Sequence, residues 1–385
     1  MASECDFPAA LMNEPWTVRL KYFQDFTVAH PLLVEAKDQL IAAISERAPN
    51  SVILVLGPTG VGKTTLLARI EQLLASELFE ELDADPGRLP VVSVEAVAPP
   101  SGNFNWRDHF RRMLHEMNEP LINRKRTMRP GGCEPDVHFM PCARAPGGEY
   151  HHAVEQALRY RRPRAVLVDE AQHLAKMTSG RRLLDQLDVI KSVANRTGTV
   201  HALFGTYDLL AFRNLSGQLS RRSIDVHFRR YRADGGEDRK KFQNVLRSFE
   251  RQIPLPEPPD LVTHWEFLYE RSVGCVGVVK EWLVRALSAI LIRGDAKLTL
   301  RDLSSHALTI PQCEKMLAEI TEGEARLEEH DGARSRFRLA LGLESGHDQM
   351  NAPPLVTPRT RPGQRRPKRD PIGVPALADA NSGII

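Results

Sequence analysis

The segment SVILVLGPTGVGKTTLLARIEQLL, residues 51–74, constrains the fold of this chain more than any other stretch. A β-branched apolar run ends at Gly57, a glycine-rich turn follows, and leucines at helical spacing begin after Lys63. The turn has the complete G-x-x-x-x-G-K-T spacing. This order of strand, loop and helix predicts a phosphate-binding loop at the end of a parallel strand.

Such a loop predicts a site for ATP and Mg²⁺. Glycines let successive N–H groups face one anion, and the helix N-terminus adds its positive end. We expect Lys63 to reach the β and γ phosphates and the Thr64 hydroxyl to ligate Mg²⁺. A chance match in a glycine-containing loop is the alternative, and the flanking strand and helix patterns weigh against it. The predicted nucleotide-binding residues are Gly57, Pro58, Thr59, Gly60, Val61, Gly62, Lys63, Thr64 and Thr65.

The acidic element that a phosphate-binding loop requires is predicted within RAVLVDEAQH, residues 164–173. The apolar run 165–168 has the composition of a buried parallel strand, and ligands collect at the carboxyl ends of such strands. We expect Asp169 to hold Mg²⁺ and Glu170 to polarise the attacking water. An isolated Asp-Glu pair would instead suggest a solvated turn, but the loop at 57–64 favours the catalytic interpretation.

A further apolar run, within TVHALFGTYDLL at residues 199–210, ends in a polar residue, Thr206. In P-loop ATPases with an extra strand between the two phosphate-site strands, such a residue senses the γ-phosphate or the lytic water. Thr206 is therefore a candidate catalytic residue. It is also suited to be an ordinary helix N-cap, and the two roles are compatible.

The apolar runs 51–56, 91–96, 165–168, 199–204 and 224–228 alternate with helical patterns. This alternation predicts an α/β fold with a five-stranded parallel sheet in the AAA+ arrangement. Lys280, on a later helix, is a candidate to reach back to the phosphates, with a surface lysine as the equal alternative. The expected divisions are an N-terminal extension (1–45), the nucleotide domain (46–235, with an insertion at about 120–150), a helical lid (236–310), C-terminal helices (311–344) and a basic, proline-rich disordered tail (345–385).

The composition excludes several classes of protein. A net charge of +3 excludes a polycation, so contacts with nucleic acid would have to be local. The five scattered cysteines argue against a disulfide framework, and neither a signal peptide nor an uninterrupted membrane span is evident. We therefore expect a cytoplasmic protein without a membrane partner, and the family resemblance described below implies that it is bacterial. The possible zinc ligands in and beside the insertion are Cys133, His138, Cys142, His151 and His152. Their spacing matches no common zinc pattern, so we favour a flexible insertion over a metal site.

A family resemblance rests on GPTGVGKT, VLVDEAQHL, FGTYDLL, QLSRRSIDVHF and SVGCVGVVKEWL, in this order over roughly residues 20–310. This combination resembles the AAA+ transposition regulators TnsC and TniB, relatives of MuB. The resemblance implies an ATP-dependent homo-oligomer, a ring or helical filament on double-stranded DNA, with the ATP site at each subunit boundary. It also implies two protein partners, a transposase and a target selector, the latter being RNA-guided or not.

Local basic clusters supply separate evidence about nucleic acid. The candidate DNA-binding residues follow the second predicted strand, in a part of AAA+ domains where loops often face a central channel. A solvated helix face is the alternative interpretation. The candidates are Arg107, Arg111, Arg112, Arg124, Lys125 and Arg126. The tail carries a second basic cluster, between Arg359 and Arg369, that suits a tether to DNA or to the transposase. A merely solubilising tail is the alternative there.

The dibasic pair in QLSRRSIDVHF, Arg221 and Arg222, has an ordinary interpretation as a solvated helix end. In AAA+ domains the helix before the fifth strand ends at the subunit interface, where an arginine points at the neighbour's γ-phosphate. Neighbouring residues on a helix diverge by about 100°, so only one of the two can fill this role. We favour Arg222, with Arg221 contacting the neighbour or the nucleotide.

Two other functions compete with transposition. A helicase or helicase loader would explain the DEAQ sequence, but a second RecA-like domain with its own arginine motifs is not evident. An AAA+ module serving secretion or signalling would be favoured by a peptidoglycan-binding or repeat domain, and the sequence shows neither.

Overall fold

A computed structural model describes residues 6–46, 52–98, 104–124, 148–174, 181–213, 223–327 and 331–343. The chain divides into two compact units, Met1–Glu328 and Glu329–Ile385. In the second unit the described residues include one helix, α15 (Asp331–Ala340). The predicted tail (345–385) and most of the predicted insertion (120–150) lie outside the described residues.

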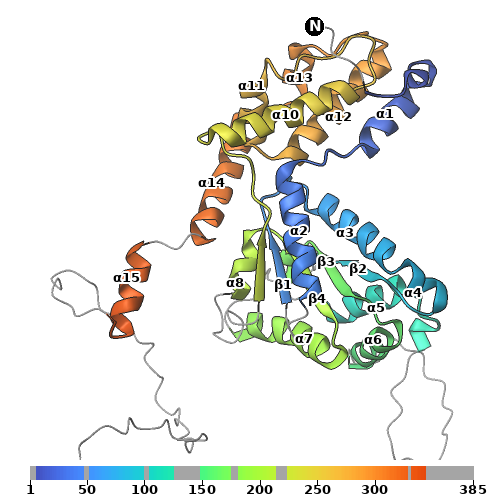
Figure 1. The fold of residues 1–385 in the computed structure, drawn as a ribbon, viewed down its shortest axis with the longest axis vertical. Coiled ribbons are helices and arrows are strands. Elements are labelled where there is room, and N and C mark those ends of the chain that lie inside the picture. The colour runs from blue at the N-terminus through green and yellow to red at the C-terminus, as the bar shows by residue number, and fades with distance from the viewer. Residues whose placement is uncertain are drawn as a thin grey trace, which may run out of the picture. The chain divides into compact units, whose positions relative to one another are not determined.

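The first unit is built on a five-stranded parallel sheet with the order β2-β3-β4-β1-β5 (Figure 1). β4 lies between β1 and β3, as the sequence predicts for an extra strand between the two phosphate-site strands. Leu56 pairs with Gly205, and Glu95 pairs with Asp169, so the carboxyl ends of neighbouring strands align. The strands are β1 (Val52–Leu56), β2 (Val91–Glu95), β3 (Ala165–Asp169), β4 (Val200–Gly205) and β5 (Ser223–His227).

Helices cover both faces of this sheet, because alternate residues of its central strands are apolar on both sides. Ile53 and Val55 of β1 belong to the core under α2 (Pro31–Ser45) and α3 (Lys63–Glu77). Val52, Leu54 and Leu56 belong to the opposite core, which is covered by α5 (Trp106–Glu116), α6 (Gly148–Arg161) and α7 (Arg181–Thr197). The predicted doubly covered α/β sheet is confirmed.

The segment after β5 is helical, as the sequence predicts for a lid. Its helices are α10 (Gly236–Gln252), α11 (Trp265–Ser272), α12 (Val276–Arg293) and α13 (Leu300–His306). Trp282 is 1 % exposed, and its indole N–H donates to the Leu303 carbonyl at 2.8 Å, which satisfies its one polar group. α1 (Trp16–Asp25), from the N-terminal extension, packs against α12 and so belongs structurally with the lid.

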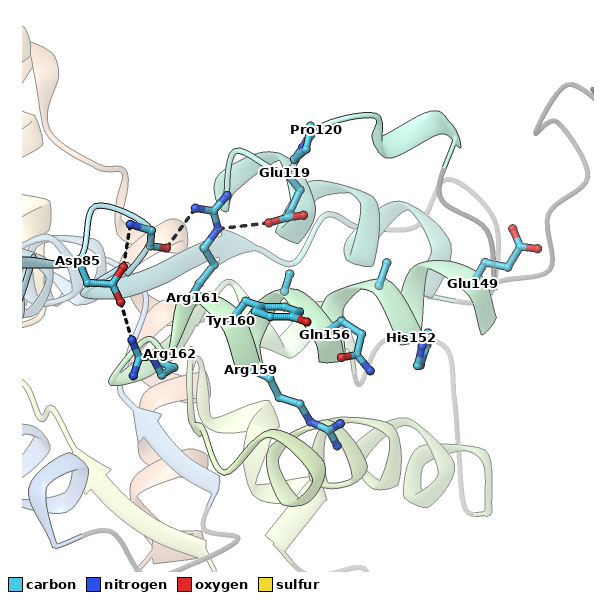
Figure 2. Close-up of a pocket in the computed structure, with 13 residues that line it drawn as sticks. Asp85, Glu119, Pro120, Glu149, His152, Gln156, Arg159, Tyr160, Arg161 and Arg162 are labelled. Carbon is cyan, nitrogen blue, oxygen red and sulfur yellow. Dashed lines mark hydrogen bonds and ion pairs between the residues drawn. The ribbon is translucent and has the colours of Figure 1, made fainter. Parts of the chain in front are cut away.

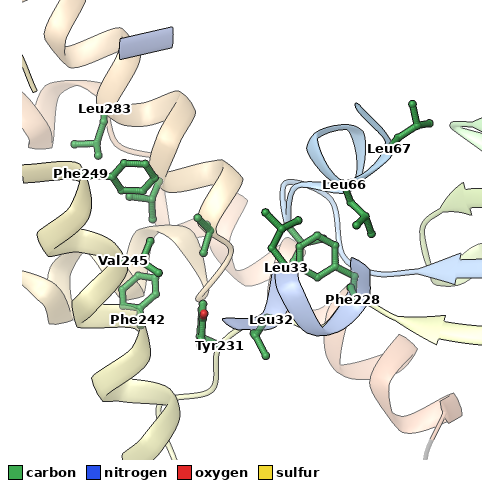
Figure 3. Packing of buried hydrophobic residues seen from close by; sticks show 14 of the residues in the cluster. Leu32, Leu33, Leu66, Leu67, Phe228, Tyr231, Phe242, Val245, Phe249 and Leu283 are labelled. Atoms are coloured by element: carbon green, nitrogen blue, oxygen red, sulfur yellow. The ribbon is translucent and has the colours of Figure 1, made fainter. Parts of the chain in front are cut away.

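One apolar core runs without a break from the sheet into the lid (Figure 3). At its centre, the His30 ring stacks on Phe228 with 6.0 Å between centroids. The Nδ1 atom of His30 lies 3.1 Å from the Tyr231 hydroxyl, and Tyr231 in turn packs against Phe242 of α10. His30 also caps α2, since it accepts the N–H of Leu33 ahead of a proline in the first turn. The chain entering the sheet and the chain leaving it therefore meet at this junction.

The remaining elements of the first unit are short, except for the last helix. They are η1 (Ala9–Asn13), α4 (Phe79–Ala84), η2 (Ile122–Arg124), η4 (Ala171–Leu174), η5 (Tyr207–Leu209), α8 (Leu210–Arg213) and α14 (Ile310–Leu327).

Among the described residues, no helix has both the length and the apolar composition needed to cross a membrane.

Candidate nucleotide site

The loop between β1 and α3 has the backbone that an anion cradle requires. Gly60 and Gly62 have φ angles of 75° and 113°, a region that side chains disfavour, and α3 begins immediately afterwards at Lys63. Lys63 is 8 % exposed, and its ammonium donates to the carbonyls of Gly57 at 3.0 Å and Pro58 at 2.8 Å. Burial lowers the pKa of Lys63 to about 8, against the opposing effect of nearby carboxylates.

The loop is joined directly to the end of β3. The Thr64 hydroxyl donates to Asp169 Oδ2 at 2.9 Å, while Asp169 Oδ1 accepts the N–H of Glu170 at 2.8 Å. Mg²⁺ is held in proteins by hard oxygen ligands, commonly one or two carboxylates together with substrate phosphates. The donor set of Thr64 and Asp169 fits that ion, since it places a hydroxyl and a carboxylate side by side next to the phosphate loop.

The carboxylate of Glu170 is held by a residue to which the sequence analysis gave no role. Glu170 has a φ of 51°, an unusual value for a side-chain-bearing residue. The side-chain amide of Gln172 donates to its Oε2 atom, and the Gln172 Oε1 atom accepts the N–H of Thr206 at 3.3 Å. Gln172 therefore bridges the ends of β3 and β4. Its only signal in the sequence was its position in DEAQ, two residues after Glu170.

Thr206 lies at the start of η5, so its backbone occupies the N-cap position. Its hydroxyl makes no capping bond to the backbone and instead donates to Asp208 Oδ2 at 3.2 Å. The N-cap interpretation is thus confirmed for the backbone and wrong for the side chain. The role of Thr206 as a sensor stays a prediction.

The lid contacts the phosphate loop directly. The N–H of Val278, in the first turn of α12, donates to the Gly60 carbonyl at 3.1 Å. A Cβ atom at position 277 would lie 2.5 Å from the same carbonyl, so only glycine permits this approach. Gly277 therefore has a packing reason, since it lets the start of α12 lie against the phosphate loop.

Lys280 does not point at the front of the phosphate loop. Its ammonium donates to the Phe23 carbonyl and lies 3.6 Å from the centroid of the Phe23 ring, in the N-terminal extension. The same side chain lines a pocket of about 110 Å³ behind the loop, which Gly62, Thr65 and His30 also line. The expectation that Lys280 reaches the phosphates has no support in this geometry, nor is Lys280 the surface lysine of the alternative.

The predicted DNA-binding residues are placed in part. Arg107 lies over the Tyr150 ring at 5.7 Å, whereas Arg112 and Arg111 lie 2.7 and 4.0 Å from Asp108 carboxylate oxygens. The side chains of Arg111 and Arg112 remain about half exposed. Arg124 ends η2. The other two predicted DNA-binding residues, Lys125 and Arg126, lie outside the described residues. The two candidates for the arginine at the subunit interface, Arg221 and Arg222, also lie outside them.

Within the described ranges, no group of three or more histidine, cysteine, aspartate or glutamate side chains is arranged to hold a metal ion. Cys133, His138 and Cys142 lie outside those ranges, so the zinc hypothesis is not tested.

A pocket of about 920 Å³ lies away from the phosphate loop, along α6 (Figure 2). Its arginines are engaged within the chain: Arg161 contacts Glu119 at 3.2 Å, and Arg162 contacts Asp85 at 2.5 Å. Arg159 donates to the Arg196 carbonyl at 2.9 Å. The Arg161–Glu119 pair joins the end of α6 to the segment after α5, and the Arg162–Asp85 pair joins the residue after α6 to the loop before β2.

Residues 47–212 match the family described as an AAA domain. The match spans the phosphate loop, the acidic end of β3 and Thr206, and with the order of the strands it establishes the P-loop AAA fold. No curated protein matches the chain.

Solved structures that resemble the chain include the ORC2 protein of Aeropyrum pernix in ADPNP and ADP complexes, with 14 % identity, coverage of 77 % of this chain and 73 % of that one, and a TM-score of 0.49. A Walker-type ATPase of Pyrococcus abyssi is 15 % identical, with coverage of 80 % of this chain and 76 % of that one, and a TM-score of 0.39. The RuvB Holliday junction branch migration motor of Thermotoga maritima has 14 % identity, coverage of 71 % and 67 %, and a TM-score of 0.36.

The buried position of Lys280 predicts a pH-dependent contribution to stability. Burial lowers the pKa of Lys280 from 10.5 to about 7. Between these values the unfolded chain binds more protons than the folded chain, so the stability of the wild type rises with pH relative to Lys280→Met. We expect the difference in unfolding free energy to grow by roughly 1 kcal/mol per pH unit between pH 7.5 and 9.5.

Urea unfolding followed by circular dichroism at several pH values measures this difference. Lys240→Met, a change at a lysine whose side chain is 75 % exposed, serves as the control and should follow the wild-type pH dependence. Parallel curves for the wild type and Lys280→Met would show that the Phe23 contacts keep the ammonium charged throughout.

Proposed function

We propose that this protein is a Mg²⁺-dependent AAA+ ATPase that assembles on double-stranded DNA and couples target selection to transposase recruitment in DNA transposition. The observation that carries the ATPase part is the hydrogen bond between Thr64 and Asp169, because it joins the phosphate loop to the acidic strand end. The match of residues 47–212 to an AAA domain supports the same conclusion.

The chemistry proposed for the site is attack of water on the γ-phosphate, in line with the leaving oxygen. When bound, Mg²⁺ neutralises charge on the phosphates. Lys63, already directed along the loop toward the Pro58 carbonyl, turns to the phosphate oxygens. Glu170 orients the water, and Gln172 holds the Glu170 carboxylate in place. Thr206, whose N–H donates to Gln172, senses the terminal phosphate in this proposal.

In this proposal the base of the nucleotide occupies the small pocket that Gly62, Thr65 and Lys280 line. Its residues come from the extension before the sheet, from α3 and from the lid, so all three regions would contact one ligand. Lys280, in this proposal, fixes the Phe23 segment at the pocket's edge and does not contact the phosphates.

The transposition part of the proposal is supported by the sequence resemblance to TnsC and TniB and by the half-exposed Arg111 and Arg112 on α5. Assembly as a ring or filament, and recruitment of a transposase and a target selector, follow from that resemblance. A helicase loader and a secretion or signalling ATPase are the competing functions that the experiments below separate.

Two substitutions test the hydrolytic site. Lys63→Ala should abolish binding of ATP, because the phosphates lose their cation and the loop loses two hydrogen bonds. Glu170→Gln should retain binding and lower turnover at least about a hundredfold, since the water loses its base. Equilibrium binding of a fluorescent ATP analogue and phosphate release measure the two effects, and normal turnover by Glu170→Gln would exclude the proposed base.

The proposal that the site works between subunits is tested at the dibasic pair. Arg222→Ala should lower turnover of the assembled protein by about 10³ to 10⁵, the range observed for arginines supplied to a γ-phosphate, and leave ATP binding by the isolated subunit unchanged. Arg221→Ala is the matched variant, with a smaller expected loss. If both variants hydrolyse ATP and assemble normally, the pair is a solvated helix end.

Assembly on DNA separates the transposition ATPase from a secretion or signalling module. Negative-stain microscopy with ATP and duplex DNA should show rings or filaments. The logarithm of the DNA affinity should fall by roughly 0.9 per log unit of salt for each phosphate contact in a subunit. Arg111→Ala combined with Arg112→Ala should reduce that slope by about two contacts. An unchanged slope would place the DNA elsewhere on the molecule.

A further inference from the structure

The helix α14 returns from the lid to the nucleotide domain (Figure 1). It contacts η5, which follows β4 after Thr206. Between them lies a pocket of about 220 Å³. Pro58, Thr59, Thr206, Tyr207 and Asp208 line it from the nucleotide domain, and Met316, Glu319 and Ile320 line it from α14. One side of the space next to the phosphate loop is therefore supplied by a helix that follows the lid.

The first contact that holds α14 here is between a glycine and an aromatic ring. A Cβ atom at Gly323 would lie 2.2 Å from the ring of Tyr207, so the helix backbone lies directly on that ring. Tyr207 is 6 % exposed, and its hydroxyl lies 2.9 Å from Nε2 of His227, at the end of β5. Glycine inside a helix disfavours the helix, and this close approach explains its presence at position 323.

The second contact is a two-point ion pair. Arg230 Nε and Nη2 lie 3.1 and 3.4 Å from the carboxylate oxygens of Glu324, and both side chains are nearly buried. Arg230 also donates to the Tyr269 hydroxyl and the Val273 carbonyl, so the same guanidinium ties α14 to the lid. A partly buried bidentate pair holds one geometry and is costly to break on one side only.

These contacts connect α14 to the catalytic carboxylate. Tyr207 directly follows Thr206, and the N–H of Thr206 donates to Gln172, which holds Glu170. A displacement of α14 therefore changes the support of Tyr207, two hydrogen bonds away from Glu170. A packed ring and a chain of hydrogen bonds form a contiguous physical path of the kind that carries coupling between sites.

A terminal phosphate would interact differently with docked and displaced α14. Glu319, an exposed acidic residue of α14, lines the pocket together with Pro58 and Thr59 of the phosphate loop. A γ-phosphate adds negative charge at this end of the nucleotide, which disfavours the docked helix, whereas a diphosphate lacks that group. Such a difference between two states is what a ligand needs in order to shift an equilibrium between them.

We propose that α14 is a displaceable wall of the nucleotide site, docked with a diphosphate and released by a triphosphate. The proposal rests on the ATPase function proposed above.

Hydrogen exchange on the full chain tests the displacement without any substitution. The amides of α14 should exchange faster in the presence of a non-hydrolysable ATP analogue than in the presence of ADP, while those of α12 should not change in this direction. Equal exchange of α14 with both nucleotides, each shown to be bound, would overturn the proposal. Failure of the wild type to bind either nucleotide would instead overturn the proposed function.

Release of a fluorescent ADP analogue in stopped-flow mixing tests the two contacts. Gly323→Ala pushes the helix from Tyr207, and Glu324→Gln removes the charge from the pair with Arg230. Each should speed release by roughly tenfold, because the docked wall that retains the diphosphate is weakened. Glu322→Gln, the same change at a side chain that is 67 % exposed, is the control and should release the analogue at the wild-type rate. Wild-type release rates in Gly323→Ala and Glu324→Gln would overturn the proposal.

Discussion

The parallel pairing of the strands is the constraint on which the site depends. Because β1, β3 and β4 all run the same way, the loops that leave their carboxyl ends meet at one edge of the sheet. The insertion of β4 between the other two leaves Thr64 close enough to reach Asp169 across it, and it brings Thr206 beside Gln172. No single loop contains this site. It exists only when three strands are aligned, and so its geometry is as stable as the core of the sheet.

The sequence predicted the sheet closely because its strands are continuous apolar runs with sharp ends. Each predicted strand agrees with the observed one to within one residue at either end. The phosphate loop and the Asp169–Glu170 pair were also predictable, since both have local spacing rules. Lys280 was not, because its partner Phe23 is 257 positions away and nothing local to α12 indicates an aromatic contact. The role of Gln172 was not predictable for the same reason, since it depends on the backbone N–H of Thr206 at the end of another strand.

The site combines a buried positive charge, on Lys63, with the negative charges of Asp169 and Glu170. Lys63 is buried and its pKa is depressed, so its positive charge is costly until an anion or a carboxylate approaches it. The carboxylates of Asp169 and Glu170 offset part of that cost, while the carbonyls of Gly57 and Pro58 accept hydrogen bonds from the ammonium. Oxygen ligands for a divalent cation and a cation for the phosphates thus lie side by side. This arrangement supports the proposal that the site binds a nucleotide together with Mg²⁺.

The continuous core at His30, Phe228 and Tyr231 has a mechanical consequence. Swinging the lid away from the sheet would expose that core to water, at about 25 cal/mol for each Å² of apolar surface. Releasing α14 separates Gly323 from Tyr207, breaks the Arg230–Glu324 ion pair and opens a second, smaller apolar cluster, in which Cys313 and Ile320 of α14 pack with residues 273–278 of the lid. The junction between the sheet and the lid therefore costs more to open than the contact of α14 beside the phosphate loop, because the larger of the two apolar clusters lies at that junction. In a protein with this asymmetry, the base would serve as a fixed anchor, and conformational work would be done at the phosphate end.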